Sequence, residues 1–122
     1  MSSIIGRYEL IKHGTYNING DYTSTSNEFS GNLIYATDRS LSVLILFKTE
    51  PKDALKDLLA YTGQFVVKGS QVEHHIKISN QVHRQNTTEI REFAFNGYEL
   101  TLKCKLNNGH MFEAIWMKIN AT

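Results

Sequence analysis

Cysteine and proline are almost missing from this 122-residue sequence: each occurs once, as Cys104 and Pro51. A single cysteine cannot form an internal disulfide, so nothing in the sequence points to an oxidising compartment. A chain of this length buries enough surface to fold without disulfides or a metal. We therefore expect one domain over residues 1–122, in which Cys104 is a small buried apolar side chain rather than a reactive thiol.

The sequence also lacks concentrated charge and long apolar runs. Thirteen basic residues nearly balance twelve acidic ones and do not cluster, so nothing indicates a nucleic-acid or membrane partner. The longest apolar run, residues 43–47, is far too short to cross a bilayer. The first residues lack the basic and apolar segments of a secretory signal. These absences favour a cytoplasmic protein.

What the sequence does contain is apolar side chains at every second position. The clearest stretch is 100–106, where leucine and cysteine alternate with threonine and lysine. In a β-strand such a pattern directs the apolar set to the core and the polar set to water. Turn signals such as Asn96-Gly97 separate these stretches. The pattern predicts strands near residues 6–13, 14–19, 29–36, 41–48, 62–68, 71–79, 86–95, 98–106 and 110–119.

One segment departs from this alternation and predicts a short helix near residues 51–60. Pro51 suits the first turn of a helix, where no backbone N–H is needed. Leu55, Leu58 and Leu59 form a single apolar stripe at helical spacing. We expect this helix to pack over one end of the sheet rather than to bind a partner.

The predicted fold class is all-β. Eight or nine short antiparallel strands fit either a β-sandwich or a β-barrel. A small up-and-down barrel is favoured, because nine strands in 122 residues leave little length for crossover connections. A barrel of about eight strands is wide enough to hold one small ligand, or to be filled by its own side chains.

Short motifs along the chain occur in a recognisable order. They lie at residues 6–10, 31–35, 60–65, 72–75, 88–91 and 100–102, and at Trp116. Together they resemble the lipocalin-like domain family, small bacterial and fungal proteins related in fold to lipocalins, and the resemblance covers nearly the whole chain. It implies a calycin-type antiparallel barrel with an interior cavity. It implies no single reaction, because activities within the family are mostly unassigned.

Two positions depart from the family pattern where the barrel closes. Tyr8 stands where tryptophan is more usual in the first strand, and Lys118 follows Trp116 where the family often ends in arginine. In lipocalins an arginine stacked on that tryptophan closes the bottom of the barrel, so we expect the closure to differ in this chain. Trp116 itself should be buried near residues 6–8, because the last strand must pair with the first to complete a barrel.

His74 is the first candidate for a functional side chain. Alternation places it on the face of Val72, Ile76 and Ile78, toward the interior, whereas His75 must face the other side. Two interpretations of His74 remain open. It is either a hydrogen-bonded core histidine, or a group that orients a ligand or acts as an acid or base.

No metal or cofactor is predicted. His74 and His75 face opposite sides of one strand and cannot chelate one metal, and His83 and His110 lack ligand spacing. The sequence contains no glycine-rich phosphate loop, nucleophile elbow or paired-cysteine zinc motif. His74 is therefore the only catalytic candidate, should the protein be an enzyme.

Tyr61 and Arg91 are further candidates for ligand binding. Tyr61 precedes the strand expected to pair with the His74 strand, so its hydroxyl either reaches the same barrel mouth or packs against the predicted helix. Arg91 shares a face with Glu89 and two phenylalanines, and is either an interior charge or a surface arginine over aromatic rings. We favour the surface, since an interior arginine needs a carboxylate partner or an anionic ligand.

The favoured function is the binding of a small hydrophobic or aromatic molecule in the barrel interior. One alternative is an isomerase- or cyclase-like enzyme that uses His74 as acid or base. Another is a filled barrel that presents its outer surface to a partner. The sequence leaves the oligomeric state, monomer or dimer, open. Aromatic residues that either line the cavity or fill the core are Tyr35, Phe47, Phe65, Phe112 and Trp116.

Overall fold

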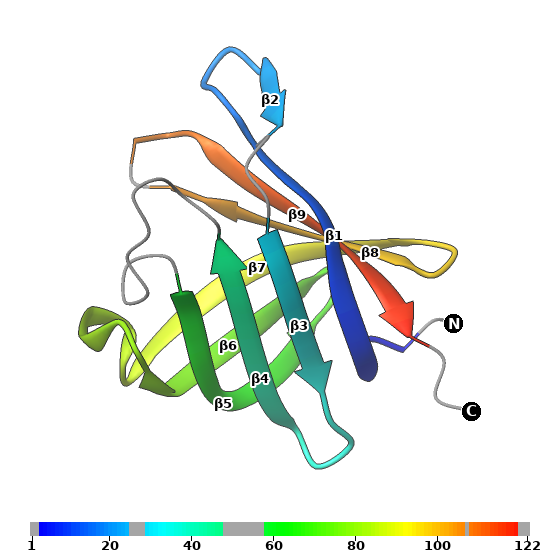
Figure 1. Cartoon of the computed structure of the whole chain (residues 1–122), viewed down its shortest axis with the longest axis vertical. Helices are drawn as coiled ribbons and strands as arrows, with labels where there is room; N and C mark the ends of the chain where they lie inside the picture. The colour runs from blue at the N-terminus through cyan, green and yellow to red at the C-terminus, as the bar shows by residue number, and fades with distance from the viewer. Residues whose placement is uncertain (1–2, 25–28, 48–57, 107, 120–122) are drawn as a thin grey trace.

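The computed structural model describes residues 3–24, 29–47, 58–106 and 108–119. In these residues the chain forms nine β-strands and one 3-10 helix of three residues (Figure 1). No helix among them has the length and apolar character needed to cross a membrane. The elements are β1 (Gly6–Tyr16), β2 (Tyr22–Ser24), β3 (Phe29–Tyr35), β4 (Ser40–Phe47), β5 (Leu58–Lys68), β6 (Gln71–Ser79), η1 (Val82–Arg84), β7 (Thr87–Asn96), β8 (Glu99–Lys105) and β9 (Met111–Ile119).

The sheet closes on itself to form a barrel. Strands that follow one another in the chain pair antiparallel from β3 to β9, and β1 pairs with both β3 and β9. The closing pair runs from Arg7 opposite Ile119 to Tyr16 opposite Met111. Strand β2 only extends one end of β1 (Figure 1). The barrel therefore has eight strands, and the predicted all-β antiparallel barrel is confirmed.

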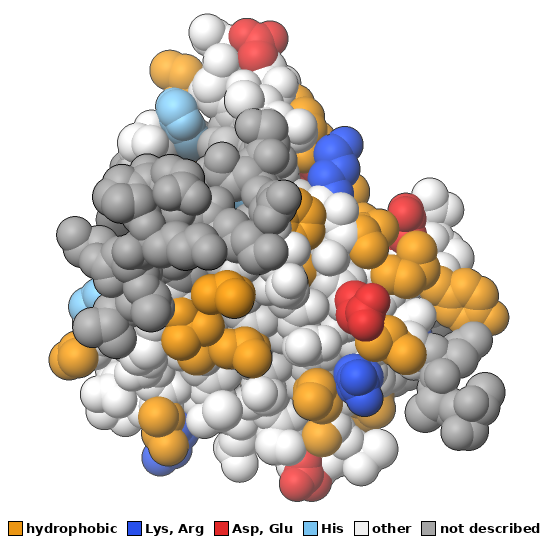
Figure 2. Space-filling view, in the orientation of Figure 1, with side chains coloured by type: hydrophobic (Ala, Val, Ile, Leu, Met, Phe, Trp, Pro, Cys, Tyr) orange, Lys and Arg blue, Asp and Glu red, His pale blue; other side chains and the backbone are white. Residues whose placement is uncertain are grey.

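Strand β4 is apolar on both of its faces. Its inward side chains, Leu41, Val43 and Ile45, are buried as the alternation predicts, whereas the outward Leu44 and Leu46 are 45% and 42% exposed. The two outward leucines have apolar neighbours, since Leu44 pairs with Ala60 and Leu46 with Leu58 of β5. Figure 2 shows apolar side chains gathered in groups on one face of the molecule, with separate acidic and basic side chains between them.

Two strands that the sequence predicts, 6–13 and 14–19, are one continuous strand, β1. The strand bends at a bulge, where Ile11 has no partner on β9. Gly14 allows a close approach of two strands: a Cβ atom there would lie 2.6 Å from the carbonyl oxygen of Thr23 in β2. The bulge and this approach let one long strand take part in three pairings.

The last three residues of the predicted helix are in a β-strand. Residues 58–60 belong to β5 and pair with β4, with Leu58 opposite Leu46. The rest of the predicted helix, residues 51–57, lies outside the described residues. Strand pairing outweighs the helical spacing of the leucines at this point, and Leu59 lines the barrel interior as a result.

A bulge in β6 changes which of its side chains face inward. Val72, His74 and Ile76 are buried as predicted, whereas Ile78 is 66% exposed. The register with β5 shifts at this point, so that Lys77 is an extra residue without a partner. Residues beyond the bulge therefore face the side opposite to that expected from strict alternation.

Gly63 of β5 lies opposite this bulge and has no room for a side chain. A Cβ atom at Gly63 would lie 1.9 Å from the carbonyl oxygen of His75. We expect Gly63→Ala to lower the free energy of unfolding by about 1–3 kcal/mol, because the β6 backbone must move to admit the methyl group. Urea denaturation measures the change. The exposed neighbour Thr62 provides the control, since Thr62→Ala should change stability by less than about 0.5 kcal/mol. Equal stability of the two variants would contradict this close approach.

One end of the barrel is closed by N-terminal residues and a lysine. The Tyr8 hydroxyl donates a 2.7 Å hydrogen bond to the carbonyl oxygen of Ile4, and both residues are buried. Nζ of Lys118 lies 5.8 Å from the centre of the Tyr8 ring and donates a 3.0 Å hydrogen bond to the carbonyl oxygen of Ser3. A lysine–tyrosine pair of the cation–π type therefore closes this end.

Candidate functional site

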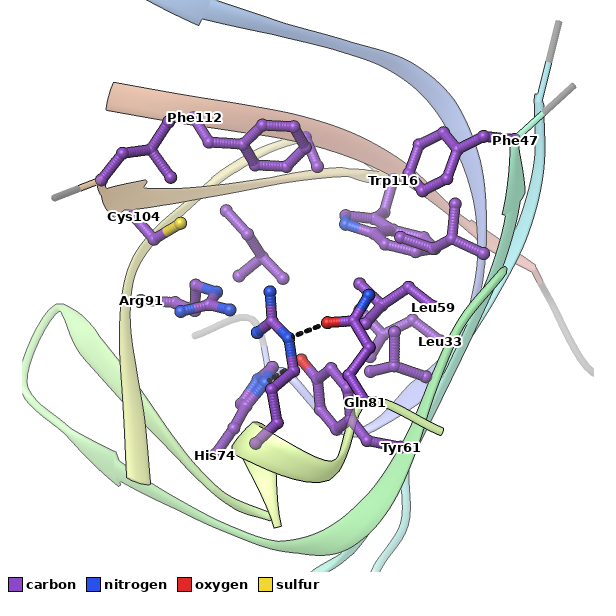
Figure 3. A pocket seen from close by; sticks show the side chains of 16 residues that line it. Leu33, Phe47, Leu59, Tyr61, His74, Gln81, Arg91, Cys104, Phe112 and Trp116 are labelled. Atoms are coloured by element: carbon purple, nitrogen blue, oxygen red, sulfur yellow. Dashed lines mark hydrogen bonds between the residues drawn. The ribbon is translucent and has the colours of Figure 1, made fainter. Parts of the chain in front are cut away.

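A cavity of about 270 Å³ lies inside the barrel (Figure 3). Its walls are mostly apolar and come chiefly from strands β3, β4, β5, β8 and β9. Apolar walls with a few converging polar groups are typical of small-molecule sites. The side chains with polar or sulfur atoms that line it are Tyr61, His74, Gln81, Arg84, Arg91 and Cys104, together with the indole of Trp116.

The five aromatic residues predicted to form the cavity wall divide into two groups. Tyr35 and Phe65 are fully buried in the core outside the cavity lining, with their ring centres 4.8 Å apart. The other three line the cavity itself and are Phe47, Phe112 and Trp116. Aromatic rings therefore supply both the wall of the cavity and part of the core next to it.

Trp116 carries an indole N–H that no described residue accepts. The side chain is 3% exposed, as predicted, and stands opposite Leu10 of β1, slightly beyond the expected residues 6–8. Its Nε1 is buried without a hydrogen-bond partner in the described part of the chain. Figure 3 shows this nitrogen on the side of the ring that faces the cavity. A buried N–H without a partner costs free energy, so it is a ready donor to a ligand.

His74 lies between two tyrosine hydroxyls. Oη of Tyr35 is 2.6 Å from its Nε2, and Oη of Tyr61 is 2.8 Å from its Nδ1. The three side chains meet because β3, β5 and β6 each direct them inward. His74 is 1% exposed, which confirms the expected interior position. His75 points to the opposite side, where its side chain is 43% exposed.

All three of these groups are uncharged at neutral pH, and burial moves the pKa of each further from neutrality. It lowers the pKa of His74 to about 3, with a further contribution from the positive charge of Arg91. It also raises the pKa of Tyr61 to about 12 and the pKa of Tyr35 well above its usual value. The chain Tyr35–His74–Tyr61 is therefore a row of neutral hydrogen-bonding groups beside the cavity.

Arg91 lines the cavity, and the surface position that the sequence favoured is wrong. Its side chain is 15% exposed and forms an ion pair with Glu89, which faces the same way on β7. Glu89 also pairs with Arg84 of η1, so two guanidinium groups share one carboxylate. Burial raises the pKa of Glu89, but hydrogen bonds and the charges of Arg91 and Arg84 outweigh this and hold it below its usual value. The shared carboxylate makes the interior arginine possible.

This end of the cavity carries an excess of positive charge. Arg84 and Arg91 contribute two positive charges and Glu89 one negative charge, while burial keeps His74 neutral. None of the described cavity-lining residues is aspartate or glutamate. The described ranges also contain no group of three histidine, cysteine, aspartate or glutamate side chains arranged to hold a metal.

Besides Arg91, three polar or sulfur-containing cavity residues do not match the sequence analysis. Gln81 and Arg84, which it did not single out, come from the β6–β7 connection, and Nε of Arg84 donates a 2.5 Å hydrogen bond to Oε1 of Gln81 (Figure 3). Because this connection has no regular periodicity, its sequence does not predict which of its side chains face the cavity. Cys104, expected to be buried, is partly exposed and lines the cavity.

His13 is a second inward histidine that the sequence analysis did not single out. It is 4% exposed, and both of its ring nitrogens lack a hydrogen-bond partner among the described residues. Its ring centre lies 5.3 Å from that of Phe47 and 6.0 Å from that of Phe112, both cavity residues. The bulge at Ile11 brings His13 inward, because it moves the inner face of β1 from even to odd positions.

Comparisons with known proteins establish the fold. No family model and no curated protein matches the sequence. A redesigned β-barrel is similar with a TM-score of 0.51 and 10% identity, over 96% of this chain and 92% of that one. A de novo designed fluorescence-activating β-barrel is similar with a TM-score of 0.50 and 8% identity, over 95% of this chain and 94% of that one. At such low identity these likenesses show a shared barrel fold.

Proposed function

We propose that this protein binds one small, mostly apolar or aromatic molecule inside its barrel. The observation that carries the proposal is the cavity of about 270 Å³, which is slightly smaller than the about 300–1,000 Å³ of typical ligand sites and so suits a small molecule. Barrels of about eight strands are wide enough to hold one small ligand. Phe47, Phe112 and Trp116 offer aromatic surface to a planar guest.

The cavity also bears on the two alternative functions. A filled barrel that acts only through its outer surface has no need of this space. Two tyrosine hydroxyls beside His74 are the kind of neighbours that an acid/base catalyst uses. However, a pKa of about 3 makes the His74 ring a weak base at neutral pH, and so binding is the better-supported function.

We also propose that the chain is a distant member of the lipocalin-like family. The eight-stranded up-and-down barrel supports this, as does the position of Lys118 over the Tyr8 ring. In that arrangement the Tyr–Lys pair takes the role that the resemblance assigns to tryptophan and arginine. An experimental structure in which Lys118 lies away from Tyr8 would remove this support.

Trp116 gives a direct test of the proposed function. It is the only tryptophan in the sequence and lines the cavity, so its fluorescence should report occupancy. We expect saturable changes in its emission on titration with small phenyl-alkyl compounds. Native mass spectrometry of freshly purified protein should, in parallel, reveal any molecule that the chain retains.

A cavity-filling substitution separates binding in the barrel from binding elsewhere. Ala114 of β9 lines the cavity and is 4% exposed, so Ala114→Leu should occupy part of the space and weaken binding at least about tenfold. Ala94 of β7 is exposed and provides the matched control. Ala94→Leu should leave affinity unchanged. Unaltered affinity of the Ala114 variant, measured by calorimetry, would place the bound molecule outside the cavity and reject the proposal.

A further inference from the structure

The Tyr35–His74–Tyr61 chain contains one more proton than its hydrogen bonds use. Each tyrosine keeps its hydroxyl proton because burial raises its pKa. Neutral His74 carries one ring proton. Three protons are thus available for two hydrogen bonds, one at Nε2 and one at Nδ1. One hydroxyl proton must point away from His74.

The cavity decides which hydroxyl carries the spare proton, since Tyr35 and Tyr61 are both buried but only Tyr61 lines the cavity. Tyr35 is 0% exposed, and His74 is the only hydrogen-bond partner of its hydroxyl among the described residues. If Tyr35 accepted from Nε2, its own proton would be buried without an acceptor, at a cost in free energy. Tyr35 therefore donates to Nε2, and the proton of His74 resides on Nδ1, which donates to the Tyr61 oxygen. The spare proton is that of Tyr61, and Tyr61 lines the cavity.

Most of the other polar groups of the cavity are also donors. Nε1–H of Trp116 is buried and unpaired within the described residues. The Arg91 guanidinium lines the cavity, and its carboxylate partner among the described residues, Glu89, is shared with Arg84. The amide oxygen of Gln81, which is an acceptor, is occupied by Arg84. A ligand therefore meets mostly N–H and O–H groups and a net positive charge.

We infer that the ligand is a monocarboxylate: an apolar or aromatic body whose ionised acid accepts hydrogen bonds from Tyr61 and Arg91. Hydrogen bonds from charged or hydroxyl donors to a carboxylate are short and strong. One excess positive charge suits a monoanion better than a phosphate dianion. Ligands with an ammonium group meet like charge and mostly donors. This inference rests on the proposed function and adds the chemical class of the ligand.

Three probes with one skeleton test the inference at neutral pH: 4-phenylbutyrate, 4-phenylbutan-1-ol and 4-phenylbutylamine. We expect calorimetry to show that the acid binds at least about tenfold more tightly than the alcohol. The amine should bind most weakly. If the alcohol or the amine binds as tightly as the acid, the inference falls while the proposed function stands. If none of the three binds, the proposed function falls and the inference with it.

The tautomer of His74 is a second, ligand-independent test. Two-dimensional ¹H–¹⁵N spectra of the imidazole should show the proton on Nδ1, and a proton on Nε2 overturns the inference. Tyr61→Phe should reduce the preference for the acid about tenfold. Tyr35→Phe removes no cavity-lining group. It should nevertheless disturb the tautomer of His74 and lower the affinity for 4-phenylbutyrate a few-fold. Tyr8→Phe, at the closed end, is the matched control and should change neither.

Discussion

Replacing Trp116 with alanine is expected to lower the free energy of unfolding by about 3–5 kcal/mol, the usual cost of truncating a large buried aromatic residue. The side chain is 3% exposed and stands between Leu10 of β1 and Leu100 of β8, where the last strand closes the barrel. Its loss joins the existing cavity to a new void that the neighbouring strands cannot fill. Urea denaturation followed by circular dichroism measures the change, since the variant has no tryptophan signal.

Tyr98 supplies the control for this truncation. It is an aromatic residue in the turn between β7 and β8 and is 60% exposed. Tyr98→Ala should change the free energy of unfolding by less than about 0.5 kcal/mol. A loss below about 1 kcal/mol for Trp116→Ala would mean that the indole contributes little to barrel closure, contrary to its burial.

The overall fold could be predicted because inward-facing residues recur at every second position over most strands. The errors lie where a local irregularity breaks that count. A single extra residue, Ile11 in β1 and Lys77 in β6, moves the following side chains to the other face. This is why strict alternation misses the inward position of His13 and wrongly predicts an inward Ile78. Periodicity carries no information about where such bulges occur.

The candidate site was predictable to the extent that it lies on regular strands. His74 and Tyr61 were identified from alternation and strand order, and both line the cavity. The sequence analysis favours a surface position for Arg91, because an interior arginine needs a carboxylate partner or an anionic ligand. The spacing of Glu89 and Arg91 on one face was the signal for an internal ion pair. Arg84 arrives from an aperiodic connection, so only the folded chain reveals it.

Acidification is expected to destabilise the barrel well above the pH at which carboxylates titrate. In the unfolded chain a histidine titrates near pH 6.5, whereas burial lowers the pKa of His74 to about 3 in the folded state. Between these values the unfolded state binds one more proton, so stability falls as pH falls, by about 1.4 kcal/mol per pH unit. Burial lowers the pKa of His13 as well, which adds a loss of the same sign.

The pH window and the responsible residue can both be measured. Above about pH 6.5 the contribution of His74 to the free energy of unfolding should be fully present. Between pH 6.5 and 5, His74 alone should lower the free energy of unfolding by about 2 kcal/mol. Urea denaturation at a series of pH values gives the slope, and His75→Gln, on the outer face, should preserve it. In His74→Gln the dependence of the free energy of unfolding on pH should be smaller by about 1.4 kcal/mol per pH unit, the contribution of one proton. Should that variant not fold, an NMR titration of wild type answers the same question, because the His74 ring should remain neutral down to pH 5. Protonation of His74 near pH 6.5 in the folded protein would contradict its enclosure between Tyr35 and Tyr61.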